Sequence, residues 1–183
     1  MKRFISIITI LLVLISIAGC SDDKEAAKKA YQISQMSNPL TFGEFAIDLP
    51  EGFYINKDPA NNEIPVAYAP DYPKHTDNYT FTALSMKQEP SDYSQEKIDA
   101  LYSDFLEAYS GLKAYEQTEV AGYTAIKIYY NTTIKDKNDK NISVEQHQCF
   151  IFTDNDVFVV TFTTNSKDYL EDYEKSLDTI VIQ

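Results

Sequence analysis

The sequence predicts an α+β domain in which helices flank an antiparallel β-sheet, and three observations support this fold class. Several segments alternate apolar and polar side chains with the period of a strand that buries one face. Short turns rich in Gly, Asn and Asp separate many of these segments. Two further segments carry apolar residues at helical spacing. Strands joined by hairpins, with helices between and after them, are typical of this fold class.

The expected strands begin with residues 40–49, where Phe45, Ile47 and Leu49 alternate with polar or small residues. Further strands are expected at 53–55, 66–69, 79–86, 118–120, 123–133, 142–153 and 157–164. The segment 157–164 is apolar on both faces, which places it centrally in the sheet. Residues 179–182 then end the chain as a short edge strand or packed tail.

Two helices are expected in the second half of the chain. Ser94 is a suitable N-cap for the first helix, and Gly111 supplies its end. Its apolar residues recur at helical spacing and predict one buried face: Ile98, Leu101, Tyr102, Phe105 and Tyr109. The second helix begins near Ser166, and its inner stripe is expected to be Tyr169, Leu170, Tyr173 and Leu177.

The first twenty residues resemble the signal of a bacterial lipoprotein. A positive start, Met1-Lys2-Arg3, precedes an uncharged apolar run over 4–18. That run is shorter than the roughly 20 residues of a membrane-spanning helix, which argues against an uncleaved anchor. It ends in Ile17-Ala18-Gly19-Cys20, which is similar to the lipobox of bacterial lipoproteins. The resemblance implies cleavage after Gly19 and a diacylglycerol on the Cys20 thiol.

The chain therefore divides into a lipoprotein signal peptide at 1–19, a lipidated tether at 20–37 and a single α+β domain at 38–183. The tether is inferred because its polar, charged sequence has no sustained apolar stripe. Two acyl chains give stable attachment to a bilayer. The expected location is the extracytoplasmic face of the cell membrane, with the membrane bound through the lipid on Cys20.

The charge balance excludes some partner classes. Removing Lys2 and Arg3 from the 16 basic residues leaves 14 against 28 acidic ones, a net charge of about −14. Phosphate binding needs a basic face, so nucleic acid is not an expected partner. Cys149 is the only cysteine besides Cys20 and lies in an apolar run, where we expect a buried, inert thiol.

No pattern of residues predicts catalysis, a cofactor or a metal site. Neither His75 nor His147 has a Cys or Glu at the spacing of zinc ligands. A Gly-rich phosphate loop and a Gly-x-Ser-x-Gly elbow are both absent from the sequence. The acidic stretches 136–139 and 154–156 suit hairpin turns better than Ca²⁺. We expect no enzyme, no cofactor and no bound metal.

Three segments resemble the PsbP-like fold, in particular its DcrB-type bacterial lipoproteins. They are FGEFAIDLPEGFYI at 42–55, EVAGYTAIKIYYNTT at 119–133 and CFIFTDNDVFVVTFTTNSKDYLEDYEKSLDTIVI at 149–182. The resemblance implies a PsbP-like α/β/α sandwich and partner binding more often than catalysis. Phe53, where a Trp is common, and the aromatic insertion at 58–79 depart from the family pattern.

The segment 58–78 is the candidate docking surface for a protein or envelope partner. It contains four prolines among Tyr68, Tyr72 and His75, and prolines lower the entropic cost of presenting side chains. Tyrosine is enriched at interfaces. Alternatively, Tyr68 and Tyr72 simply cover a sheet edge. The leading function is a non-catalytic binding or accessory module, and the alternatives are an envelope enzyme with an unrecognised carboxylate site or an acidic cation- or envelope-binding structural protein.

Overall fold

The computed structural model describes residues 21–56, 65–135, 139–166 and 168–183, and a seven-stranded antiparallel sheet forms its centre. The strand order is β3-β4-β5-β9-β8-β7-β6. In chain order these strands are β3 (Tyr54–Asn56), β4 (Val66–Tyr68), β5 (Asn78–Leu84), β6 (Leu112–Val120), β7 (Tyr123–Lys135), β8 (Asn141–Phe152) and β9 (Val157–Thr164). The prediction that 157–164 is central is confirmed, because β9 is the fourth of the seven strands.

A second, three-stranded sheet packs over the first and has the order β1-β2-β10. Its strands are β1 (Pro39–Phe42), β2 (Phe45–Asp48) and β10 (Val181–Ile182). The alternation of Phe45, Ile47 and Leu49 correctly indicated a strand, β2, but residues 39–42 form a separate strand before it instead of continuing into it. Gly43 has a φ of +58°, a value that favours glycine, and the chain turns there so that Phe42 pairs with Phe45. The tail joins this sheet as the expected edge strand.

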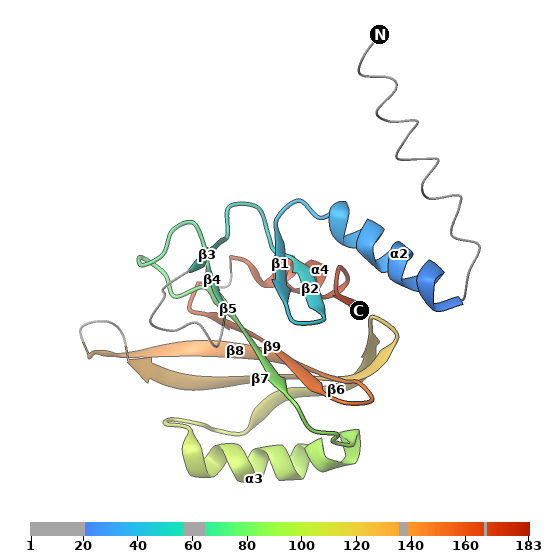
Figure 1. Cartoon of the computed structure of the whole chain (residues 1–183). Helices are drawn as coiled ribbons and strands as arrows, with labels where there is room; N and C mark the ends of the chain where they lie inside the picture. Colours follow the sequence, from blue (N-terminus) through green and yellow to red (C-terminus); the bar gives the residue numbers. More distant parts are fainter. Residues whose placement is uncertain (1–20, 57–64, 136–138, 167) are drawn as a thin grey trace.

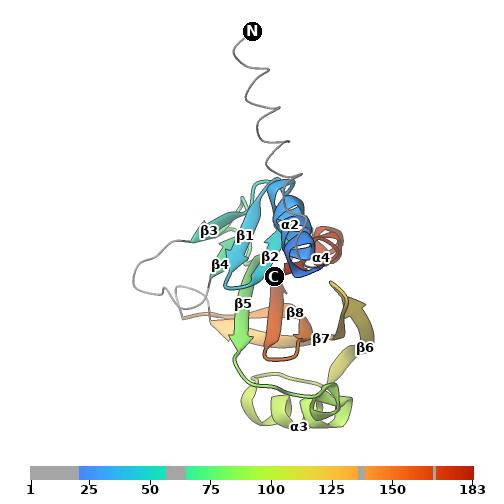
Figure 2. The ribbon, with the colours of Figure 1, turned by 45° about the vertical axis from the view of Figure 1, so that its right-hand side comes forward.

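Helices lie on both sides of the large sheet (Figure 1). Helix α3 (Gln95–Phe105), preceded by the short 3-10 helix η2 (Pro90–Tyr93), covers one face. The opposite face is covered by the small sheet and α4 (Leu170–Leu177), and α2 (Ser21–Ser34) lies beyond them (Figure 2). This arrangement confirms the predicted α+β fold, an antiparallel sheet flanked by helices.

Two apolar cores fill the spaces between these layers. The larger lies between the two sheets and α4, and its most buried rings include Phe45, Tyr79, Phe81, Phe162 and Tyr173. The smaller lies under α3 and contains Ile98, Ile126, Ile128 and Tyr130. Because successive side chains of a strand point to opposite faces, β7, β8 and β9 supply residues to both cores.

Helix α3 begins after Ser94 as predicted, but its predicted buried face is only partly right. Ile98 is 4% exposed, whereas Leu101 and Phe105 are 53% and 77% exposed. The helix also ends at Phe105, so Tyr109 packs against the core from the following loop. Asp99 explains the orientation, because its carboxylate accepts hydrogen bonds from the Tyr109 hydroxyl and the Leu112 N–H and turns that side of the helix toward β6.

Both terminal segments differ in detail from the predictions. Helix α4 begins at Leu170, four residues later than predicted, because Ser166 forms a turn in which its Oγ accepts from the Asp168 N–H and donates to Asp77 Oδ2. The predicted inner residues Tyr173 and Leu177 are buried. Helix α2 occupies most of the expected tether, and its described side chains are largely exposed.

Candidate functional site

Three tyrosine rings gather at the β3–β4 edge of the large sheet. Tyr54 in β3 is directly paired with Tyr68 in β4, and their ring centroids lie 6.0 Å apart. Tyr72 reaches back from the following loop, so that its ring centroid lies 4.1 Å from that of Tyr68 at an interplanar angle of 31°. We call these three residues the tyrosine cluster.

The tyrosine cluster is partly open to solvent. Tyr54 and Tyr72 are 46% and 38% exposed, and Tyr68 lies half-buried between them. Burial raises the pKa of Tyr68, and the neighbouring Tyr72 and Tyr54 raise it further, so this hydroxyl stays protonated at neutral pH. The cluster therefore offers apolar ring area together with neutral hydroxyl groups, a combination that suits binding rather than acid–base chemistry.

Backbone hydrogen bonds hold the loop that carries Tyr72. The Ala69 N–H donates to the Asp77 carbonyl at 2.9 Å, and the Tyr72 N–H donates to the Ala69 carbonyl at 3.1 Å. The Thr76 N–H donates to Asn165 Oδ1 at 3.1 Å, which joins the loop to the end of β9. These contacts fix the Tyr72 ring against Tyr68.

The three residues predicted as a docking surface are only partly brought together. Tyr68 and Tyr72 are in ring contact, whereas His75 lies with its Nε2 3.8 Å from Asp71 Oδ2. Tyr54 was missed by the sequence reasoning, although pairing the short strand at 53–55 with the one at 66–69 would have placed it opposite Tyr68. Pro59 and the other residues of 57–64 lie outside the described residues.

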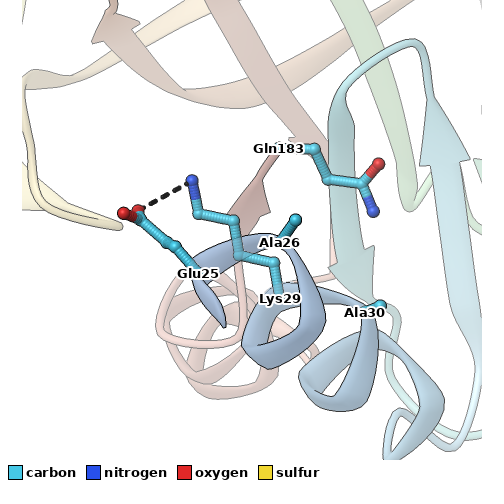
Figure 3. A pocket seen from close by; sticks show the side chains of 5 residues that line it. All are labelled: Glu25, Ala26, Lys29, Ala30 and Gln183. Carbon is cyan, nitrogen blue, oxygen red and sulfur yellow. Dashed lines mark ion pairs between the residues drawn. The ribbon is translucent and has the colours of Figure 1, made fainter. Parts of the chain in front are cut away.

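Two hollows elsewhere on the molecule have less favourable chemistry. The first, about 530 Å³, lies between α2 and the chain end, where Ala26, Ala30 and Gln183 surround an ion pair of Glu25 and Lys29 with an Oε1–Nζ distance of 3.1 Å (Figure 3). The pair neutralises its own charge. The second hollow has a volume of about 200 Å³, and its polar lining residues are Asn131, Ser143, Glu145, Thr164 and Asn165.

The structure also shows how the other reactive groups are placed. Cys149 is a free cysteine, fully buried, and burial raises its pKa to about 12, which fits the expected inert thiol. His147 stacks on Tyr129 with ring centroids 4.6 Å apart. Among the described residues, no three His, Cys, Asp or Glu side chains come together in a way that could hold a metal ion.

The described part of the chain has no helix that is both long and apolar enough to cross a membrane. Cys20, the expected lipidation site, lies outside the described residues. Lipidation at Cys20 therefore stays a prediction from the sequence, as do the boundaries of the signal peptide and the domain.

No protein-family model matches the chain, and no curated protein sequence matches it significantly. Several solved structures do match it. The chain aligns with the cyanobacterial PsbP of Synechocystis over 79% of its length, at 9% identity and a TM-score of 0.54. It aligns with PA94, a Pseudomonas aeruginosa protein of unknown function, over 79% of its length, at 14% identity and a TM-score of 0.55.

A third structural match is LpqN, a protein involved in cell envelope biogenesis of Mycobacterium tuberculosis. It aligns over 84% of this chain at 16% identity and a TM-score of 0.51. The chain spans 91%, 96% and 96% of the three proteins, and 45% of a longer protein from Bacteroides thetaiotaomicron. At these identities the likeness shows the fold alone, so the predicted PsbP-like fold is supported.

Proposed function

We propose that the chain is a lipid-anchored, non-catalytic binding module of the cell envelope that holds its partner on the tyrosine cluster. The observation that carries the proposal is the contact of Tyr54, Tyr68 and Tyr72 on an exposed sheet edge. LpqN shares the fold and is involved in cell envelope biogenesis, which supports an envelope setting.

The geometry of the tyrosine cluster suits docking for two reasons. The rings already touch one another, so binding a partner orders few side chains and costs little rotamer entropy. Each ring also combines apolar area with a hydroxyl that donates and accepts hydrogen bonds. Exposed aromatic groups of this kind are enriched at protein interfaces.

Anchoring through Cys20 completes the proposal. Two acyl chains on the thiol would hold the chain on the outer face of the membrane. The module would then meet envelope components at a high local concentration, so a modest intrinsic affinity would suffice. The acidic composition makes nucleic acid an unsuitable partner.

Capture of a partner from the native envelope tests the proposal. The full chain is tagged at its C-terminus, crosslinked in intact cells and recovered in detergent. We expect Tyr68→Ala with Tyr72→Ala to reduce capture of the partner about tenfold, as loss of about 1.4 kcal/mol of binding free energy would. The melting temperature of the double variant should stay within a few degrees of the wild type.

Tyr31→Ala is the matched control, because Tyr31 is 65% exposed but lies on α2, away from the cluster. It should leave capture unchanged. Early unfolding of the double variant would instead mean that Tyr68 and Tyr72 belong to the core. Undiminished capture by a stable double variant would place the binding surface elsewhere.

A further inference from the structure

The tyrosine cluster belongs to a larger sheet face, and the strand register shows which residues share it. Directly paired residues of neighbouring strands point to the same face. Pairing runs from Tyr54 through Tyr68 and Asn78 to Thr163, and then to Gln146 in β8. Gln146 pairs with Tyr130, which packs under α3, so the whole row lies on the α3 side of the sheet.

A second row runs parallel to the first. Asn56 pairs with Val66, and Val66 pairs with Thr80. Thr80 then pairs with Thr161, and Thr161 with Gln148. We call these two rows of five residues the neutral face, because none of the ten side chains is an acid or a base.

The neutral face has fewer charged residues than the composition of the chain predicts. Asp, Glu, Lys and Arg make up 24% of the chain, so two or three charged residues would be expected among ten average positions. The face instead carries hydroxyl and amide groups with one aliphatic side chain, Val66. Uncharged polar groups do not produce the electrostatic field that would attract an ionic ligand. They also do not form the continuous apolar area that a lipid chain requires.

The neutral face is open at one end and closed at the other. Tyr54 and Asn56 are exposed, and Tyr68, Asn78 and Thr80 are half-buried. Toward β9 the exposure falls to 9% for Thr161 and 5% for Thr163. At β8, the hydroxyl of Tyr102 in α3 donates to Gln148 Oε1 at 2.6 Å and ends the face.

Because exposed tyrosine rings lie beside uncharged polar side chains, we infer that the ligand of the tyrosine cluster is an uncharged glycan chain. The inference rests on the proposed function and names the chemical class of the partner. A sugar ring has an apolar C–H side that can stack on an exposed tyrosine ring, and hydroxyls at its edge that pair with amide and hydroxyl groups. Tyr54 and Tyr72 supply the rings, and Asn56, Asn78 and Thr80 supply the donors and acceptors.

The dimensions of the face favour a chain of sugars over a single sugar. Neighbouring strands lie about 4.8 Å apart, so the exposed and half-buried part of the first row, from β3 to β5, spans about 10 Å. A ligand laid along that row meets the aromatic side chains first and the hydroxyl groups after them. The Gln146 Nε2 donates to Thr163 Oγ1 at 3.2 Å, so the inner part of the row is already hydrogen-bonded and rigid.

Affinity electrophoresis of the full chain in detergent tests the inference. The gels contain dextran, mannan or glycol chitin as uncharged polysaccharides, or polygalacturonate as an anionic one. We expect at least one uncharged polysaccharide to retard the protein and polygalacturonate to have no effect. Calorimetry with that polysaccharide should give an affinity that changes less than about twofold between low and high salt, because no ion pair forms.

Substitutions then locate the site. Tyr72→Ala should weaken binding about tenfold through loss of ring stacking, whereas Tyr72→Phe, which keeps the ring, should retain most of the affinity. Tyr31→Ala should bind as the wild type does. The inference is overturned if no uncharged polysaccharide retards the protein, if only polygalacturonate does, or if Tyr72→Ala binds normally.

The outcomes also separate this inference from the proposed function. Suppose an envelope protein is captured and lost with Tyr68→Ala and Tyr72→Ala, while no uncharged polysaccharide binds. The cluster is then a protein-docking surface, and only the glycan inference fails. If neither polysaccharide binding nor capture depends on the cluster, both proposals fail.

Discussion

At the scale of single residues, exposure separates core tyrosines from surface tyrosines, a difference that the sequence alone does not show. Tyr79, Tyr130 and Tyr173 are at most 2% exposed and belong to the cores. Tyr54 and Tyr72 belong to the same residue type and lie in equally aromatic sequence, but they face solvent. Their strand partners and loop position decide this difference, so aromatic composition by itself indicates neither a core nor a binding surface.

Phe53 and Tyr72 provide the residue-scale test of this division. Phe53 is 4% exposed and makes edge-to-face contacts with Tyr79 and Tyr169, with ring centroids 5.3 and 5.1 Å apart. Phe53→Ala should lower the free energy of unfolding by about 3–5 kcal/mol. Tyr72→Ala should lower it by less than about 1 kcal/mol. Urea unfolding measures both, and equal losses would contradict the assignment of Tyr72 to the surface.

The Cys149 thiol predicts a pH dependence of stability. Burial raises its pKa from the ordinary value of 9.0 to about 12 in the folded chain. Between these values the unfolded thiol loses its proton while the folded one keeps it, so a rise in pH favours unfolding. The free energy of unfolding of the wild type, measured relative to that of Cys149→Ala, should therefore fall as the pH rises from 9 to 12. A constant difference would show that the thiol ionises equally in both states.

At the scale of secondary-structure elements, α3 carries apolar side chains on two sides, and only one of them is buried. Ile98→Ala should lower the free energy of unfolding by about 2–5 kcal/mol, because Ile98 lies in the core under the helix. Leu101→Ser should change it by about 0.5 kcal/mol or less, because Leu101 is 53% exposed. Thermal unfolding of the two variants measures both losses. A larger loss of stability for Leu101→Ser would mean that Leu101 is buried, as the helical spacing predicted.

The hydrophobic pattern predicted an element best where both faces of that element are buried. The run 157–164 has apolar side chains on both faces, and this correctly indicated a central strand. Periodicity failed on α3, since apolar spacing marks a stripe but not how far the helix rotates over the sheet. The hydrogen bonds of Asp99 to Tyr109 and Leu112 set that rotation, and they join residues 10 and 13 positions apart.

The candidate site was predictable only in part for a related reason. Prolines and tyrosines in one loop indicated Tyr68 and Tyr72 as a surface. Tyr54 joins them through strand pairing, a long-range contact that local sequence does not encode. The neutral face depends on register across five strands, and a shift of one residue would turn every side chain to the other side of the sheet.

At the scale of the whole molecule, α2 and α3 lie on opposite sides of the large sheet (Figure 1). The neutral face is on the α3 side, whereas α2 is the described element nearest in sequence to Cys20. An anchor at Cys20 would therefore attach the molecule by the side away from the neutral face and leave that face accessible to the envelope.

Lipid anchoring predicts the behaviour of a single variant. Cys20→Ala removes the thiol that would carry the diacylglycerol. We expect the variant to lose incorporation of labelled fatty acid and to be released or misprocessed. Fractionation and gel mobility measure this outcome. A variant that stays membrane-bound with unchanged mobility would contradict the lipoprotein assignment.

Site-specific photo-crosslinking in living cells shows whether the tyrosine cluster contacts an envelope partner. A photoreactive phenylalanine analogue takes the place of Tyr72 in one strain and of Tyr31, on the exposed side of α2, in another. We expect a crosslinked adduct from position 72 and none from position 31. Adducts from position 31 alone, or from neither position, would contradict this expectation.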